Sequence, residues 1–162
     1  MNIKPYGYAE QKKLAKYPDR IAHIQECQEA IPNIQDLNLD ETQDLQDRLK
    51  RYHKELRTYE MSLNAIVGFY RAIIEEAATD CAAIQVLIDN APADVKKERL
   101  LSLKTSKVQT EQQMVFVKQQ CKSLSAHIES VKHAKRAVVA ALKQNRLVNL
   151  SELLKALDKP SC

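Results

Sequence analysis

The chain contains two consecutive stretches in which apolar residues recur every seven positions, and this period constrains its fold more than any other feature. The first stretch covers residues 41–89 and the second covers residues 94–144, with only residues 90–93 between them. At 1.5 Å per residue, each stretch corresponds to a helix roughly 75 Å long. Because the connection is so short, the two helices must fold back on each other. We therefore predict an all-α fold built on a long antiparallel, coiled-coil-like helical hairpin, with helices over about 41–89 and 93–145.

Two positions of each seven-residue repeat are predicted to face inward. In the first helix these are Leu49, Leu56, Leu63, Tyr70, Ala77 and Ile84, with the companions Leu45, Tyr52, Tyr59, Ile66, Ile73 and Leu87. In the second helix they are Leu103, Thr110, Val117, Leu124, Val131 and Val138, with the companions Leu100, Met114, Cys121, Ile128 and Leu142. Asp80, Lys107 and Lys135 interrupt the pattern. A sustained period of seven favours near-antiparallel packing against a neighbouring helix.

Shorter elements are expected at both ends. Residues 1–18 contain Pro5, Gly7 and Pro18 around a basic piece, so they are predicted to be flexible or partly helical. A helix over residues 19–30 is predicted to end before Pro32 and to pack on residues 65–74, where the apolar face widens. A short amphipathic helix is predicted over residues 150–158. From the length of the chain we expect residues 19–162 to form a single domain.

Composition excludes several classes of protein. The chain has only two glycines among 162 residues. Phosphate-cradling loops need backbone conformations that glycine adopts most easily, so we do not expect a nucleotide-binding fold. The four cysteines have neither CxxC nor zinc-finger spacing, so we interpret them as reduced thiols. No stretch approaches the roughly 20 apolar residues that span a bilayer. We expect a soluble, cytoplasmic protein without a membrane partner.

The residue pattern does not indicate catalysis. Helical bundles often hold a dimetal site through Glu-x-x-His motifs, and the residues three before the four histidines are Arg20, Lys50, Leu124 and Ser130. There is also no nucleophile elbow or Gly-rich strand-to-helix turn. We therefore predict a protein that is not an enzyme, with no metal, no cofactor and no small-molecule substrate.

Cations gather near the predicted open end of the hairpin. No acid lies between Glu129 and Glu152, whereas the chain as a whole has a net charge of only +4. Such a cluster can be a solvated face, or it can contact an acidic protein or the phosphates of a nucleic acid. The candidate residues for phosphate or acidic-partner binding are Arg48, Lys50, Arg51, Lys54, Arg57, Lys132, Lys135, Arg136, Lys143 and Arg146.

The excess of apolar positions favours protein binding, because a two-helix hairpin buries little interior per residue and often completes its core by association. We predict a non-catalytic helical adaptor or assembly protein that binds itself or another protein, with a homo-oligomer expected. The candidate contact residues are Phe69, Tyr70, Ile74, Met114 and Phe116. The alternative is a nucleic-acid-binding accessory or regulatory factor that uses the basic end. The salt dependence of binding distinguishes the two functions, since the affinity for phosphates falls steeply as ionic strength increases.

Overall fold

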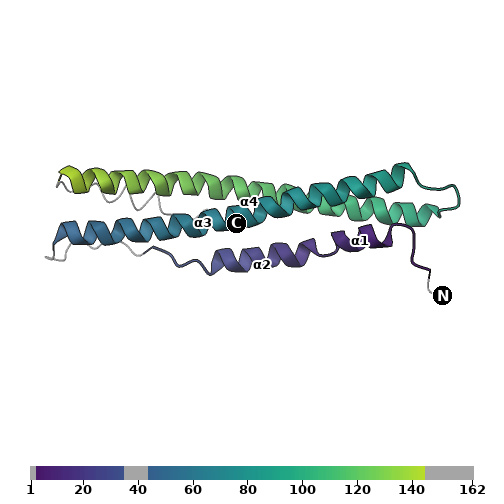
Figure 1. Ribbon diagram of the computed structural model, residues 1–162, viewed down its shortest axis with the longest axis horizontal. Coiled ribbons are helices and arrows are strands. Elements are labelled where there is room, and N and C mark those ends of the chain that lie inside the picture. The colour runs from purple at the N-terminus through teal and green to yellow at the C-terminus, as the bar shows by residue number, and fades with distance from the viewer. Residues whose placement is uncertain (1–2, 35–43, 145–162) are drawn as a thin grey trace. The chain divides into compact units, whose positions relative to one another are not determined.

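The computed structural model describes residues 3–34 and 44–144, and most of these residues are helical. Figure 1 shows two long helices, α3 and α4, which pack against each other, and two shorter helices, α1 and α2. The bounds are Tyr8–Leu14 for α1, Tyr17–Glu29 for α2, Leu45–Asp89 for α3 and Lys97–Gln144 for α4. No strand occurs among these residues. The predicted all-α class and the pairing of two long helices are confirmed.

Both long helices begin later than predicted, and local hydrogen bonds explain why. At the start of α3, the backbone N–H of Gln46 donates to Oδ1 of Asp44 at 3.0 Å, which caps the first turn. Before α4, the N–H of Val95 donates to the carbonyl of Pro92, so Pro92 belongs to a turn and not to the helix. The predicted cap at residues 40–43 and the predicted helix at 150–158 lie outside the described residues.

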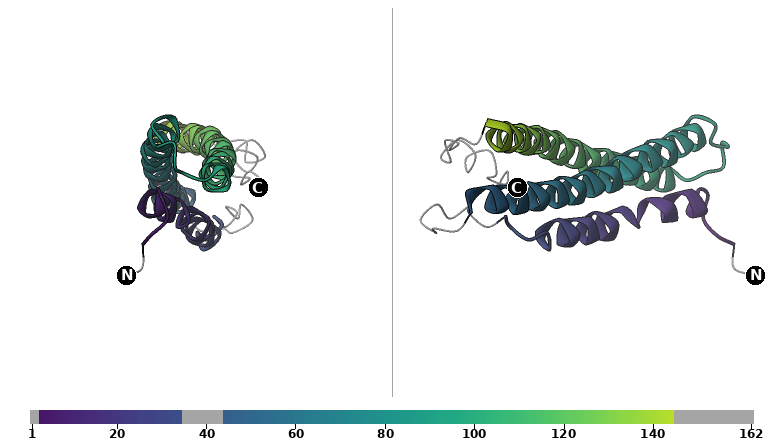
Figure 2. Two further views of the ribbon diagram at one scale, coloured as in Figure 1. Left: turned by 90° about the vertical axis from the view of Figure 1, so that its right-hand side faces the viewer. Right: turned by 60° about the vertical axis from the view of Figure 1, so that its left-hand side comes forward.

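The N-terminal segment forms two helices. α2 begins at Tyr17, two residues earlier than predicted, and Pro18 lies in its first turn, where the missing N–H leaves no hydrogen bond unmade. Gly7 precedes α1 with a φ of 73°, a backbone conformation that glycine adopts without strain. A Cβ on Gly7 would lie 3.1 Å from both Cδ atoms of Leu103. The chain therefore passes very close to α4 at this point, and both views of Figure 2 show α1 beside the ends of α3 and α4 that adjoin their connection.

The chain divides into two compact units. The first unit comprises Met1–Glu26 and Phe69–Gln119, and the second comprises Cys27–Gly68 and Gln120–Cys162. The interior of the first unit includes Leu14, Tyr17, Ile21, Tyr70, Ile73, Ala77, Ile84, Leu103 and Val117. The interior of the second includes Leu49, Tyr52, Leu56, Leu63, Leu124, Val131, Ala134 and Val138. The single domain predicted for residues 19–162 concerns cooperative folding and stays a prediction.

The three residues that interrupt the apolar repeat all have polar partners. The hydroxyl of Tyr17 donates to Oδ2 of Asp80. Lys107 pairs with Glu111 one turn further along α4, with 2.8 Å between Nζ and Oε1. Lys135 pairs with Glu60 of α3. Charged groups near an interior are tolerated when they are paired and hydrogen-bonded, so these exceptions do not break the packing of the helices.

No helix in the described ranges has the length and apolar character needed to cross a bilayer.

Candidate protein-binding surfaces

An apolar stripe runs along the outer side of α4 in the first unit. Leu101, Val108 and Val115 are spaced by seven residues, and their exposed fractions are 64%, 50% and 56%. At about 100° per residue, a position two residues from the buried Leu103 lies on nearly the opposite face of the helix. The stripe therefore points away from the interior, and we call these three residues the α4 stripe.

The apolar contact residues predicted from the sequence are divided between the interior and the surface. Tyr70 and Met114 are buried, so neither is available to a partner of the folded chain. Ile74 is half-buried. Phe69 and Phe116 are exposed, at 52% and 39%. The structure thus reduces the predicted set to two exposed aromatic residues and one partly covered isoleucine.

The α4 stripe is not among the contact residues predicted from the sequence. The signal is present in the sequence as a second seven-residue spacing, shifted by two positions from Leu103, Thr110 and Val117. On a helix of 3.6 residues per turn, such a shift places apolar groups opposite the first set. A helix with apolar residues on two opposite faces has one face left to cover after it packs on its neighbour.

The members of the predicted basic cluster differ in their exposure and in their ion pairs. Arg48 is buried. Lys135 forms an ion pair with Glu60 at 2.5 Å, and Lys132 forms one with Glu129 at 3.2 Å. Arg146 lies outside the described residues. The remaining members are exposed: Lys50, Arg51, Lys54, Arg57, Arg136 and Lys143.

Four of these exposed cations lie within two turns of α3 in the second unit. They are Lys50, Arg51, Lys54 and Arg57, and none of them forms an ion pair with another described residue. Residues at i, i+4 and i+7 share one side of a helix, so Lys50, Lys54 and Arg57 form a row. This part of α3 thus presents four exposed cations on the second unit.

Charged contacts hold α2 against α3 in the first unit. Glu76 accepts hydrogen bonds from Lys16 and Arg20, each at 2.5 Å, and these bonds lower the pKa of the Glu76 carboxyl. Burial, and then the hydrogen bond to Asp80, raise the pKa of Tyr17. The contacts lie beyond residues 65–74, the section on which the N-terminal helix was predicted to pack. These contacts stabilise the fold and leave no group for a ligand, because the five side chains already pair with each other: Lys16, Tyr17, Arg20, Glu76 and Asp80.

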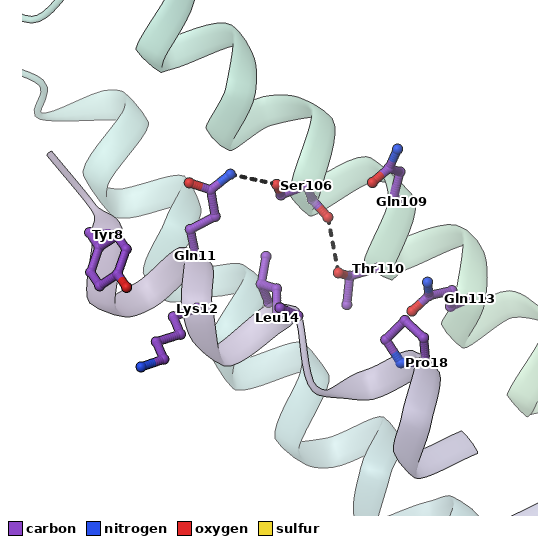
Figure 3. Close-up of a pocket in the computed structure, with 10 residues that line it drawn as sticks. Tyr8, Gln11, Lys12, Leu14, Pro18, Ser106, Gln109, Thr110 and Gln113 are labelled. Atoms are coloured by element: carbon purple, nitrogen blue, oxygen red, sulfur yellow. Dashed lines mark hydrogen bonds between the residues drawn. The ribbon is translucent and has the colours of Figure 1, made fainter. Parts of the chain in front are cut away.

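A polar hollow lies between α1 and α4 in the first unit. Figure 3 shows Gln11 pointing across it to Ser106 of α4. The Nε2 of Gln11 donates to the hydroxyls of Ser102 at 3.0 Å and Ser106 at 2.8 Å. The hollow has a volume of about 390 Å³. Its polar lining is mostly uncharged, and Lys12 is the one charged side chain among the residues that line it. The direct hydrogen bonds of Gln11 to both serines indicate that these residues hold α1 against α4.

A second hollow, of about 460 Å³, lies within the second unit. One wall is the non-helical chain after α2, from Ile31 to Ile34, and the other is the side of α3. The α3 wall is lined by Arg51, Lys54, Glu55, Thr58, Tyr59 and Ser62. Each of these positions is three or four residues away from another member of the set, so together they form a continuous strip along the helix.

Two buried groups have raised pKa values. Burial raises the pKa of the Cys81 thiol and raises that of Tyr59 to about 12. Both groups are buried, Tyr59 in the second unit and Cys81 in the first. Among the described residues, no three His, Cys, Asp or Glu side chains are grouped so that they could hold a metal ion. Among the described residues, we take up two surface features as candidate binding sites: the α4 stripe and the second hollow, which we call the groove.

No protein-family model, curated protein or solved structure matches this chain.

Proposed function

We propose that this protein is a non-catalytic helical adaptor or assembly protein that associates through the outer face of α4. The observation that carries the proposal is the α4 stripe. Single exposed apolar residues are common on proteins. Three at a regular spacing of seven, each at least half exposed, form a row with a rise of about 10.5 Å between members. Such a row suits a second helix that crosses at a shallow angle.

A second copy of the chain is the partner that we propose. The same stripe is present on every copy, so two copies can bury it against each other in an isologous, two-fold contact. Charged residues alternate with the apolar ones along this side of α4, as Lys104, Glu111 and Lys118. Mixed charges at the rim keep such a face soluble when it is not covered. The proposed arrangement includes the antiparallel, coiled-coil-like pairing of α3 with α4, which leaves this outer face to a partner.

The test is light scattering on a size-exclusion column over a wide range of protein concentration. We expect the wild type to form an oligomer that Val115→Glu reduces in mass. Val86→Glu is the matched control, because Val86 lies on α3 and is 57% exposed, close to the 56% of Val115. A wild type that stays monomeric at every concentration would remove self-association, and equal behaviour of the two variants would exclude the α4 stripe as the contact.

A nucleic-acid-binding function is the second candidate. It is favoured by the row formed by Lys50, Lys54 and Arg57, which face solvent and form no ion pair with other described residues. Phosphate binding by such a row would weaken steeply as salt increases. The measurement is fluorescence anisotropy of a labelled DNA duplex at several salt concentrations, with the variant Lys54→Glu/Arg57→Glu. Binding that survives both high salt and this charge reversal would exclude phosphate contacts by the row.

A further inference from the structure

The groove in the second unit combines a basic end with an apolar wall. Arg51 and Lys54 line the groove and are exposed, and neither forms an ion pair with another described residue. The opposite wall contributes Ile31, Pro32 and Ile34. A ligand that fits both features carries negative charge beside an apolar group.

The hydroxyl groups of the groove add a further requirement. The hydroxyl of Thr58 donates to the carbonyl of Lys54 at 3.1 Å, and that of Ser62 donates to the carbonyl of Thr58 at 3.1 Å. Since both hydrogens are already used, the two oxygens can only accept further bonds. Acceptors one turn apart match the N–H donors of an extended peptide backbone. The strip thus offers cations for carboxylates at one end and acceptors for amide hydrogens at the other.

The groove is less suited to a nucleic acid. The lining holds two cations, Arg51 and Lys54, and one carboxylate, Glu55, so it suits a ligand with few negative charges better than a continuous chain of phosphates. Tyr59, the one aromatic residue of the lining, is buried and offers no exposed face on which a base could stack. Aliphatic walls of isoleucine and proline favour aliphatic side chains over bases.

We propose that this groove is a peptide-binding site for an acidic segment of a partner protein that carries aliphatic residues next to its carboxylates. Arg51 and Lys54 bind the carboxylates, the wall of Ile31, Pro32 and Ile34 covers an aliphatic side chain, and the oxygens of Thr58 and Ser62 accept backbone N–H groups. The site lies in the second unit, whereas the α4 stripe lies in the first. It therefore does not depend on association through the stripe.

The experiment uses the full chain and a short fluorescein-labelled peptide of alternating leucine and glutamate, with binding followed by anisotropy. Arg51→Glu/Lys54→Glu should weaken binding by about tenfold or more, because reversal turns two attractive contacts into repulsive ones. Lys50→Glu/Arg57→Glu is the matched control. It makes the same change of charge on the same turns of α3 but outside the groove, and it should change the affinity by less than about twofold.

Two further peptides and one further variant of the chain complete the test. Peptides with glutamine for glutamate, or serine for leucine, should each bind weakly, since the first lacks charge and the second lacks an apolar group. Ile34→Ser should weaken binding of the parent peptide, with helicity checked by circular dichroism. The proposal is overturned if the two charge-reversal variants lose affinity equally, or if single-stranded DNA competes as well as the peptide does.

The chain's own sequence supplies one more decisive variant. Residues 35–43 follow Ile34 and include Asp36, Leu37, Leu39, Asp40 and Glu41, which have the proposed chemistry. If the peptide binds only to a chain with Asp36→Asn, Asp40→Asn and Glu41→Gln, the ligand is an internal segment and the assignment to a partner protein is wrong. If the wild type binds the peptide and these changes do not alter its affinity, a separate partner is supported.

Discussion

The hydroxyl of Tyr59 on α3 and Nε2 of His127 on α4 are hydrogen-bonded at 2.9 Å in the interior of the second unit. The two rings meet edge to face, with centroids 5.7 Å apart and planes at 87°. Edge-to-face aromatic contacts add to the energy of burial, and a buried hydroxyl needs a hydrogen-bonding partner. This pair therefore helps to hold α3 against α4 in this unit.

Tyr59→Phe should keep the ring contact and remove the hydrogen bond. We expect the free energy of unfolding at pH 7 to fall by about 1 kcal/mol. At high pH the phenylalanine variant should instead be more stable than the wild type, because burial raises the pKa of Tyr59 from 10.0 to about 12. A raised pKa in the folded state gives a contribution to stability that is complete below the unfolded value near 10 and is lost as the pH rises toward 12.

Urea denaturation at a series of pH values from 7 to 12 checks this prediction. Between pH 10 and 12 the wild type should lose about 2 to 3 kcal/mol that the phenylalanine variant retains, so the two stability curves should cross. Tyr17→Phe provides a comparison. Burial and the bond to Asp80 also raise the pKa of Tyr17, so this variant should likewise retain stability that the wild type loses at high pH. Parallel curves for the wild type and Tyr59→Phe would contradict the assignment.

Lys135 and Lys132 lie one turn apart on α4 and provide a matched pair of ion-pair deletions. The side chains of Lys135 and Glu60 are mostly covered, whereas Glu129, the partner of Lys132, is largely exposed. Lys135→Met leaves a covered carboxylate without its cation and should cost about 2 kcal/mol. Lys132→Met should cost less than about 1 kcal/mol, because exposed ion pairs contribute little.

Equilibrium unfolding in urea measures the stability cost of Lys135→Met and of Lys132→Met. Glu60→Gln, alone and combined with Lys135→Met, completes a double-mutant cycle. The double variant should recover part of the loss, since the uncompensated charge is then absent. Equal costs for Lys135→Met and Lys132→Met would show that Lys135 is as open to solvent as Lys132. In that case Lys135 would return to the set of cations available to a ligand.

The sequence was sufficient to predict one of the two inward positions of the repeat in each long helix, whereas four companion residues are only partly buried: Leu45, Leu87, Leu100 and Leu142. All six positions of the repeat that starts at Leu49 are buried, and so are all six of the repeat that starts at Leu103. This success has a simple cause, because burial along a helix follows the periodicity of its own apolar residues.

The sequence was not sufficient to predict which charges are available to a ligand. Lys135 and Arg51 both occur in basic stretches, but only Lys135 lies beside a covered carboxylate of the other long helix. The partner, Glu60, is 75 positions away in the chain. The groove was missed for the same reason, since its two walls are joined through residues 35–43, whose sequence does not indicate that Ile31 to Ile34 return to α3.

The two glycines should respond in opposite directions to replacement by alanine. Gly68 lies inside α3, and a Cβ added there meets no atom within 4 Å. Gly68→Ala should therefore stabilise the chain by about 0.5 to 1 kcal/mol, because alanine favours the helix and restricts the unfolded chain. Gly7→Ala should destabilise it, since the φ of 73° is strained for alanine and the new Cβ would press on Leu103 at 3.1 Å.

Thermal and urea denaturation of the two single variants and of the double variant measure these effects. Because the glycines lie in different units, the changes in free energy should add. A neutral Gly7→Ala would show that α1 is held loosely against α4. A destabilising Gly68→Ala, if it also lowers the oligomer mass in light scattering, would show that a partner approaches α3 at this open position, and would place the association surface on α3 in place of the α4 stripe.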